Sequence, residues 1–276
     1  MTAHPCKAVV DYFRGKCALI SGGSSGIGLA TARQLRGAGA HLVLLARGEQ
    51  RLEQAREQLE ALPGHGGEVT TMALDVGDGE AVARALAAPP RPVDVLISNA
   101  GVVMPGHFLE LPTEQFEEQM RINYMGAVHL TRAVLPSMVE RNGGHLAYVS
   151  SLVGLMGIFG YTAYAASKFA LRGFAECMRC EALPHGVRVS VCYPADVDTP
   201  QLAFEEQYKP AETRAIAGEI KAMPADDVAA TLLDRMAAGK FHIVPGSGAW
   251  FTDLGYRLFP GLIRSMFDSA VRKARG

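Results

Sequence analysis

The sequence lacks an apolar run long enough to cross a bilayer, because no window reaches about 18 uninterrupted apolar residues. Residues 1–15 carry His4, Lys7, Asp11 and Arg14, so the apolar centre of a signal peptide is missing as well. These absences predict a protein that neither spans a membrane nor is exported. We therefore expect a cytoplasmic location.

An excess of charge of either sign is also missing. The formal net charge is −1, and no block of lysine and arginine precedes the C-terminus. A nucleic-acid-binding surface would need such a basic patch, so no nucleic-acid partner is expected. The composition instead favours a small-molecule ligand.

Cysteine and histidine are too few and too scattered to form a disulfide framework or a metal site. The five cysteines are an odd number, which favours a reduced compartment. Cys177 and Cys180 form a single C-x-x-C motif inside a helical pattern, where a packing role is expected. None of the eight histidines pairs with another at helical spacing, so no metal is predicted.

Short apolar runs alternate with amphipathic stretches along most of the chain, which predicts β-α alternation. Strands are expected at residues 16–21, 41–46, 69–74, 93–98, 144–150, 188–193 and 242–244. Helices are expected at 29–38, 50–62, 80–87, 164–183 and 226–238, with two more within 112–138. This order predicts the α/β class, as a single-domain Rossmann-type doubly wound parallel sheet with ligands at the carboxyl ends of its strands.

The single domain is expected to cover residues 1–276, with different functions in its two halves. Residues 1–150 should mainly bind a cofactor, while 151–276 should contain the catalytic groups and an amphipathic C-terminal segment. The alternation stops after Pro194, and the polar stretch 199–223 is predicted to be helical. Such an insertion would form a helical lid over the substrate.

A glycine-rich turn between the first strand and the first helix predicts a dinucleotide site. Glycine allows the backbone to approach a pyrophosphate, and the positive end of the following helix points at the phosphates. Serine hydroxyls in the turn add donors. The predicted contacts are Gly22, Ser24, Ser25, Gly26, Ile27 and Gly28.

Arg47 favours NADPH over NADH. It follows the second strand, where a site for NADH usually has an acidic residue, and an arginine suits a ribose 2′-phosphate. Arg51 is a candidate for a second phosphate contact, although both arginines could be ordinary solvated side chains. Asp75, after the third strand, could accept from the adenine amino group or simply cap its loop.

Tyr164 and Lys168 are predicted to share one helix face at i and i+4. This pair predicts carbonyl reduction, in which Tyr164 donates a proton and Ser151 hydrogen-bonds the carbonyl oxygen. Lys168 would hold the nicotinamide ribose and lower the pKa of the tyrosine. Asn123 is a candidate for holding a water that resupplies Lys168, or for bonding the backbone instead.

Two neighbouring side chains are weaker candidates. Tyr161 has no lysine four residues later and is expected to line the substrate pocket. Ser150 is the less suitable of the two adjacent serines. Serine-hydrolase chemistry is disfavoured, because no Gly-x-Ser-x-Gly elbow surrounds either serine.

These motifs together resemble the short-chain dehydrogenase/reductase family, along almost the whole chain. The resemblance rests on the glycine loop, Ser98-Asn99-Ala100-Gly101, Asn123, Ser151, Tyr164 and Lys168, which occur in the family's order. It implies that Asn99, Pro194, Val197 and Thr199 contact the cofactor, as do Tyr164 and Lys168. Two residues depart from the family pattern: Ser21 stands where many members have threonine, and Ala195 where glycine is usual.

Within that family, residues 157–176 and 193–213 look like those of 3-ketodihydrosphingosine reductases. The resemblance implies NADPH-dependent reduction of 3-ketosphinganine (3-dehydrosphinganine) to sphinganine, and a homodimer or homotetramer. The alternatives are reduction of another lipid ketone, such as a 3-oxoacyl, steroid or retinoid substrate, and a non-catalytic nucleotide-binding regulatory protein. The complete catalytic set argues against the second of these.

The implied long-chain amino-ketone has an ammonium group that needs a counter-charge. The predicted lid offers Asp196, Asp198, Glu205 and Glu206, and we expect Asp196 or Glu205 to meet it.

Residues 250–275 form an amphipathic pattern that Pro260 would interrupt. Apolar Phe251, Leu254, Leu258, Leu262 and Met266 lie opposite Arg257, Arg264, Asp268 and Arg275. The segment could pack on the core or on another subunit, or make a peripheral contact with the cytoplasmic membrane face.

Overall fold

The computed structural model describes residues 5–62, 67–218 and 221–275. Its centre is a seven-stranded sheet in the order β3-β2-β1-β4-β5-β6-β9, and every neighbouring pair is parallel. The predicted doubly wound sheet is confirmed. The strands are β1 (Cys17–Ser21), β2 (His41–Ala46), β3 (Val69–Ala73), β4 (Val95–Ser98), β5 (Gly144–Val149), β6 (Val187–Cys192) and β9 (His242–Ile243).

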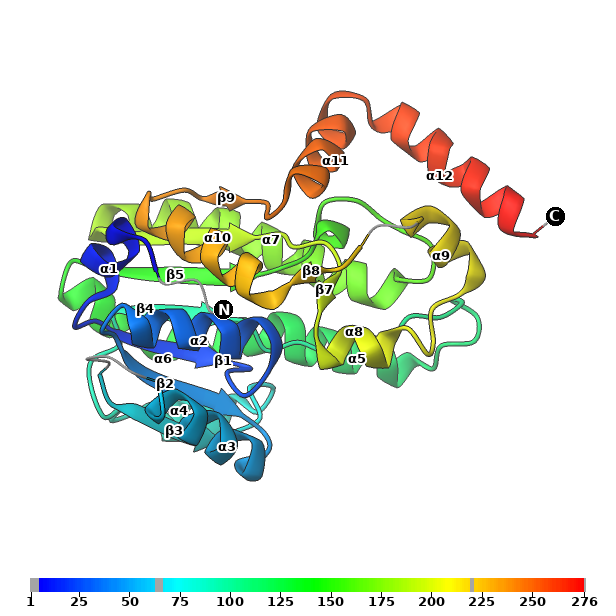
Figure 1. Cartoon of the computed structure of the whole chain (residues 1–276). Coiled ribbons are helices and arrows are strands. Elements are labelled where there is room, and N and C mark those ends of the chain that lie inside the picture. Colours follow the sequence, from blue (N-terminus) through cyan, green and yellow to red (C-terminus); the bar gives the residue numbers. More distant parts are fainter. Residues whose placement is uncertain (1–4, 63–66, 219–220, 276) are drawn as a thin grey trace.

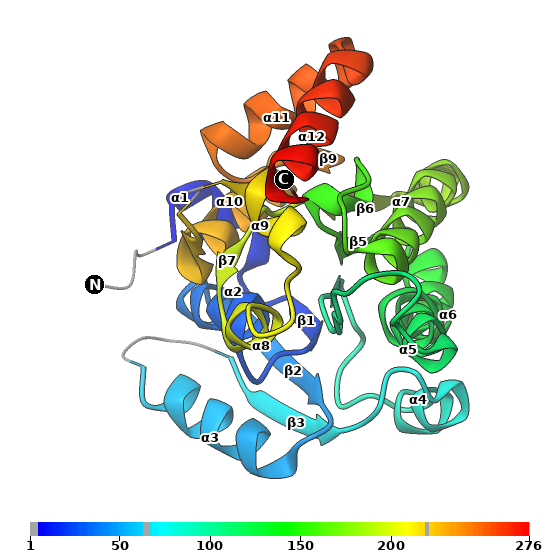
Figure 2. The same cartoon turned by 90° about the vertical axis from the view of Figure 1, so that its right-hand side faces the viewer.

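Helices cover both faces of the sheet (Figures 1 and 2). One layer consists of α1 (Lys7–Phe13), α2 (Gly26–Gly37), α3 (Glu49–Glu60) and α10 (Ala225–Ala237). The other consists of α4 (Gly79–Ala85), α5 (Thr113–Met120), α6 (Gly126–Glu140) and α7 (Thr162–Ala182). A π-helical turn, η1 (Arg121–Met125), joins α5 to α6, and two 3-10 turns, η2 (Leu152–Gly154) and η3 (Leu183–His185), flank α7.

The sheet separates two apolar cores, and the alternation of side chains along each strand supplies both. In β1, Cys17 and Leu19 pack into the core under α6 and α7, while Ala18 and Ile20 pack into the core under α2 and α10. Because both faces are buried, these strands are continuous apolar runs.

The segment after β6 differs from the prediction. The stretch 199–223 forms two short helices, α8 (Pro200–Glu205) and α9 (Ala211–Ala217), where more continuous helix was expected. Pro210 precedes α9 and supplies no backbone N–H, which favours a break at this point. A two-stranded pairing of β7 (Val197–Asp198) with β8 (Met223–Pro224) joins the two ends of the segment.

The C-terminal segment forms α11 (Ser247–Leu258) and α12 (Pro260–Arg275), with the interruption at Pro260 as predicted. The two helices project from the body of the protein, and α12 returns towards α9 (Figure 1). Of the residues in the expected apolar stripe, Leu254 is half-buried and Leu262 is 60% exposed. In the part of the chain that the structure describes, no helix has the length and apolarity needed to cross a membrane.

Two further details were not anticipated. The helix α1 was not predicted, although Val9 and Phe13 anchor it in the core beside α10. Cys177 and Cys180 are exposed free thiols on α7, so the expected packing role is wrong. Their positions on the helix face away from the sheet.

Candidate active site

Two adjoining cavities, of about 230 and 550 Å³, lie at the carboxyl ends of the strands. Gly22, Asn99, Ser151 and Pro194 all line the smaller one, and they follow β1, β4, β5 and β6 respectively. Strand ends therefore bring together residues that are far apart in sequence. The other predicted residues that line this cavity are Ser25, Gly26, Ile27, Tyr161, Tyr164, Lys168, Asp196, Val197, Thr199 and Glu205.

The glycine turn has the tight geometry expected of a phosphate cradle. Gly22 and Gly26 have φ of +66° and +51°, in the left-handed region that favours glycine. A Cβ added to Gly28 would lie 2.2 Å from the carbonyl oxygen of Gly22, so this position tolerates no side chain. Gly28 therefore packs against the backbone of the turn and does not line either cavity.

Asn99 and Ser21 hold the glycine turn against the neighbouring strand. The Asn99 amide donates to the carbonyl oxygens of Ser21 at 3.1 Å and Gly22 at 3.4 Å. The Ser21 hydroxyl oxygen accepts from the backbone N–H groups of Asn99 at 2.9 Å and Ala100 at 3.0 Å. A serine here thus fills a bridging role between β1 and β4.

The larger cavity contains the residues expected to meet the adenosine end of the cofactor. Ser24, Arg47, Arg51 and Asp75 line it, and Gly22 and Ser25 are shared with the smaller cavity. Arg47 and Arg51 are exposed, and neither makes an ion pair with a described residue. Both guanidinium groups are therefore free to bind a phosphate.

Asp75 is already engaged in two contacts. One carboxylate oxygen accepts from the Gly77 backbone N–H at 2.9 Å, and the other from the Arg121 guanidinium at 3.0 Å. Burial raises its pKa, but these hydrogen bonds outweigh the burial and leave the pKa below its usual value. The loop-capping alternative is what the structure shows, and contact with adenine stays a prediction.

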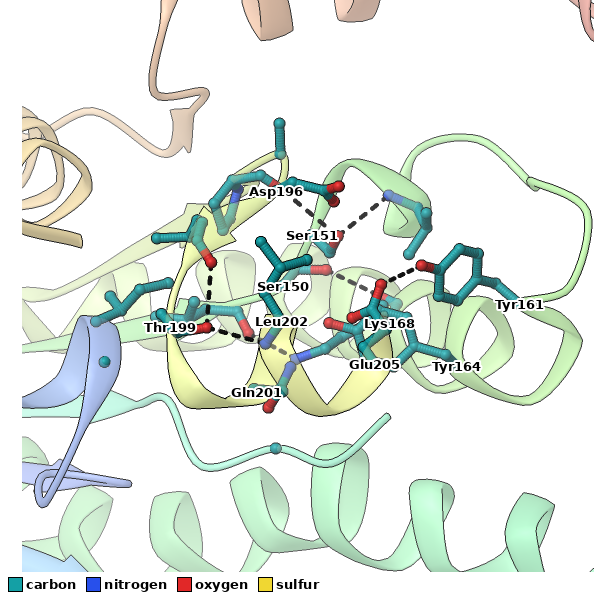
Figure 3. A pocket seen from close by; sticks show the side chains of 18 of the residues that line it. Ser150, Ser151, Tyr161, Tyr164, Lys168, Asp196, Thr199, Gln201, Leu202 and Glu205 are labelled. Carbon is teal, nitrogen blue, oxygen red and sulfur yellow. Dashed lines mark hydrogen bonds between the residues drawn. The ribbon is translucent and has the colours of Figure 1, made fainter. Parts of the chain in front are cut away.

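Three of the expected catalytic residues, Ser151, Tyr164 and Lys168, line the smaller cavity together (Figure 3). Tyr164 and Lys168 occupy successive turns of α7 and are 8% and 3% exposed. Lys168 donates to the Val149 carbonyl oxygen at 3.0 Å, and Ser151 donates weakly to the Pro194 carbonyl oxygen at 3.4 Å. Each hydroxyl or ammonium group keeps capacity for a ligand in the cavity.

Burial dominates the proton affinities of this pair. It raises the pKa of Tyr164, the nearby carboxylate of Glu205 adds to that rise, and Ser151 partly opposes it. Burial also lowers the pKa of Lys168 to about 8. The ammonium of Lys168 lies 5.5 Å from the Tyr164 ring centroid and is itself desolvated, and the expected lowering of the tyrosine pKa by this lysine stays a prediction.

Asn123 lies in the π-helical turn η1, behind the cavity wall. Its amide donates to the Val102 carbonyl and to the Ser167 hydroxyl, both at 2.9 Å, and its oxygen accepts from the Val102 backbone at 2.8 Å. Backbone bonding, one of the two expected roles, is thus observed. The second lone pair of the Asn123 side-chain oxygen could still accept a hydrogen bond from a water. That such a water resupplies Lys168 with protons stays a prediction.

Tyr161 and Ser150 occupy the secondary roles predicted for them. Tyr161 lines the cavity, and its hydroxyl donates to Glu205 (Figure 3). Ser150 is buried and donates to the backbone carbonyl of Lys168 at 3.2 Å, which ties β5 to α7. Ser151 is therefore the serine available to a substrate carbonyl.

The carboxylates expected to meet an ammonium group are brought together, but a lysine already contacts them. Asp196 and Glu205 both line the cavity, and Lys209 lies between them at 3.1 and 3.2 Å. Sequence reasoning missed Lys209. Its spacing of four residues from Glu205 is a signal for an ion pair on one helix face, and that signal was available.

A metal site is not visible in the chain from 5 to 62, 67 to 218 and 221 to 275. No group of three histidine, cysteine, aspartate or glutamate side chains there is placed to hold an ion.

Solved structures of short-chain dehydrogenases have the same fold as this chain. One from Burkholderia phymatum, in complex with NAD, matches with a TM-score of 0.77 at 27% identity, over 91% of this chain and 96% of that one. One from Sphingobium yanoikuyae, in complex with NADPH, matches with a TM-score of 0.75 at 26% identity, over 90% and 95%. Since these two relatives bind different nucleotides, the fold alone does not select the cofactor.

Sequence relatives extend the similarity to lipid enzymes. The 3-ketodihydrosphingosine reductase of Bos taurus is 39% identical over 86% of this chain and 73% of its own length. A fatty acyl-CoA reductase of Acinetobacter baylyi is 34% identical over 91% of this chain and 87% of its own. The family model described as short chain dehydrogenase matches residues 16–209. With this match and these relatives, the chain belongs to the short-chain dehydrogenase family of oxidoreductases.

Proposed function

We propose that this oxidoreductase uses NADPH to reduce 3-ketosphinganine to sphinganine. The observation that carries the proposal is one cavity lined by Tyr164, Ser151 and Lys168, by the glycine turn and by the carboxylates of Asp196 and Glu205. The two hydroxyls and the lysine suit a ketone, and the carboxylates suit the ammonium next to it. The similarity to curated 3-ketodihydrosphingosine reductases supports the same substrate.

The reaction divides between the cofactor and the side chains of the cavity. Bound NADPH supplies a hydride to the carbonyl carbon. Ser151 donates a hydrogen bond to the carbonyl oxygen, and Tyr164 transfers its proton there as negative charge develops. Lys168 holds the nicotinamide ribose. Burial, which raises the pKa of Tyr164, favours the protonated phenol before substrate binds.

The direct experiment follows NADPH oxidation by the purified protein with 3-ketosphinganine. The same assay includes 3-oxoacyl thioesters, long-chain acyl-CoA and steroid ketones. We expect the sphingoid ketone to give the highest kcat/KM. Brisk turnover of another lipid with none of 3-ketosphinganine would reject this substrate but retain the reductase chemistry. No turnover of any carbonyl, with intact NADPH binding, would instead indicate a regulatory protein.

Arg47 is the residue that we propose selects NADPH. Arg47→Ala should weaken NADPH binding by about tenfold or more, because a guanidinium that pairs with a phosphate forms strong charge-assisted hydrogen bonds. NADH binding should change little, since that cofactor has no 2′-phosphate. Titration of nucleotide fluorescence measures both affinities. Equal loss for both nucleotides would contradict the selective role, and Arg51→Ala tests the second arginine in the same way.

Asp196 or Glu205 is proposed to meet the substrate ammonium. Alanine at the responsible position should raise KM for the amino-ketone by about tenfold, because a buried charge loses its partner. KM for the corresponding ketone without an amine should stay within about twofold. Steady-state kinetics on both single variants and the double variant decides between them. An unchanged KM for the amino-ketone in the double variant would reject this contact.

We also propose that the C-terminal helices contact the cytoplasmic membrane face. Phe259, Leu262 and Met266 are exposed on or beside α12, and residues 257–275 hold five basic side chains and one acidic one. Leu262→Asp with Met266→Asp should abolish sedimentation with anionic vesicles, whereas Leu183→Asp, at another exposed leucine, should not. Equal sedimentation of the unmodified protein, the double variant and Leu183→Asp would reject the contact.

The cytoplasmic location and the assembly into a homodimer or homotetramer stay predictions. Light scattering on the purified protein measures the assembly directly.

A further inference from the structure

Lys209 is a buried cation at the centre of an acidic cluster. Its side chain is only 3% exposed, and its ammonium lies 3.1 Å from Asp196, 3.2 Å from Glu205 and 2.5 Å from Glu206. Although burial alone would lower its pKa, these three carboxylates raise the pKa above its usual value. The lysine is therefore charged and accepts no proton from a substrate.

The cluster has more negative than positive charge. Asp196, Glu205 and Glu206 are opposed by Lys209 and by Arg214, which pairs with Glu206 at 2.7 Å. Three carboxylates and two cations leave one negative charge uncompensated. A second ammonium group entering the cluster would cancel it, whereas a neutral or anionic headgroup would not.

The cluster also lies beside the reacting groups. Glu205 accepts a hydrogen bond from Tyr161, whose ring centroid is 5.9 Å from that of Tyr164. The charges of Glu205 and Asp196 both act on the Tyr164 hydroxyl. An amine on the carbon next to a carbonyl held by Tyr164 would therefore lie in the same cavity as Glu205, Asp196 and Lys209.

Glu206 could remain paired with Lys209 after the lysine leaves the other two carboxylates. Glu206 and Asp196 have similarly exposed side chains, at 43% and 41%, whereas Glu205 is only 10% exposed. Lys209 already contacts Glu206, so a small rotation of the lysine would retain that ion pair while releasing Asp196 and Glu205. The flexible four-carbon stem of a lysine allows such a rotation.

We propose that Lys209 is a displaceable counter-ion, which holds the ammonium subsite formed by Asp196 and Glu205 until a substrate ammonium replaces it. This role rests on the proposed function for its natural ligand. Lys209 is then a specificity-determining residue: ligands with a primary amine recover the energy of the ion pairs that they displace, and ligands without one do not. The subsite would disfavour the neutral ketones that fit the same cavity.

The test measures binding of octylammonium and of octanol to the NADPH-loaded protein by calorimetry. Lys209→Met should bind octylammonium about tenfold more tightly than the unmodified protein, because the internal competitor is gone. Its affinity for octanol should stay within about twofold. Lys209→Arg, which keeps the cation, should bind octylammonium no more tightly than the unmodified protein does.

A second variant keeps the test decisive if Lys209→Met does not fold. Lys209→Met combined with Glu206→Gln removes one charge of each sign and leaves the net charge of the cluster unchanged. It should show the same selective gain for octylammonium. If neither folded variant gains affinity for octylammonium, or if both probes shift together, Lys209 is a fixed structural counter-ion and the proposal is overturned.

This binding experiment is independent of turnover. Failure to reduce 3-ketosphinganine would reject the proposed substrate without altering the two affinities. Conversely, a reductase that turns over 3-ketosphinganine but shows no selective gain in Lys209→Met would keep its function and lose this role for the lysine.

Discussion

Tyr164→Phe should lower kcat for ketone reduction by about a thousandfold, within the range that loss of a general acid produces. The phenylalanine ring retains the packing of the buried tyrosine but has no proton to give to the carbonyl oxygen. NADPH binding should stay within about threefold of the unmodified protein, since the nucleotide cradle is unchanged. Stopped-flow reduction and nucleotide titration measure the two effects separately.

Tyr161→Phe is the matched control for this variant. It removes a hydroxyl from the same cavity, but one that is directed at Glu205. We expect its kcat to fall much less than that of Tyr164→Phe, with its main effect on KM. A Tyr164→Phe variant that kept a tenth of the activity would show that another group supplies the proton.

Gly28→Ala should abolish nucleotide binding and destabilise the protein by about 2 kcal/mol or more, as overpacking against a fixed backbone does. The added methyl group would lie 2.2 Å from the Gly22 carbonyl oxygen, and 2.8 Å from the Asn99 amide nitrogen. Neither atom can retreat without opening the turn. Thermal unfolding and NADPH titration measure the two consequences.

Gly173→Ala provides the comparison for that loss. Gly173 lies within α7, and a Cβ there would meet nothing within 4 Å. Alanine should therefore stabilise the helix by about 0.5 to 1 kcal/mol and leave nucleotide binding unchanged. If Gly28→Ala bound NADPH normally, the tight turn would not be what forms the cradle.

The main sheet could be predicted because each buried strand is a short apolar run between a turn and an amphipathic helix. β1 and β2 show this clearly, since both of their faces are covered and their apolar residues are continuous. The short pair β7 and β8 gave no such signal. Two residues are too few for a period, and their pairing depends on the path of the chain between them.

The catalytic residues could be predicted by type and spacing, but their electrostatics could not. Spacing places Tyr164 and Lys168 on one helix face, yet it does not reveal that burial raises the pKa of the tyrosine and lowers that of the lysine. The position of Lys209 between Asp196 and Glu205 likewise requires the fold of the segment after β6. Such long-range neighbours are determined by tertiary structure and have no local pattern.

The pairing of β7 with β8 has a consequence for how the substrate range of this scaffold could change. The Met223 backbone N–H donates to the Asp196 carbonyl at 2.9 Å, so the segment between these strands leaves and re-enters the body of the protein at nearly one point. The segment between β7 and β8 can therefore be replaced by one of another length and sequence while the nucleotide cradle stays intact. Evolution could thus adapt one reductase body to new lipids by replacing a single closed loop.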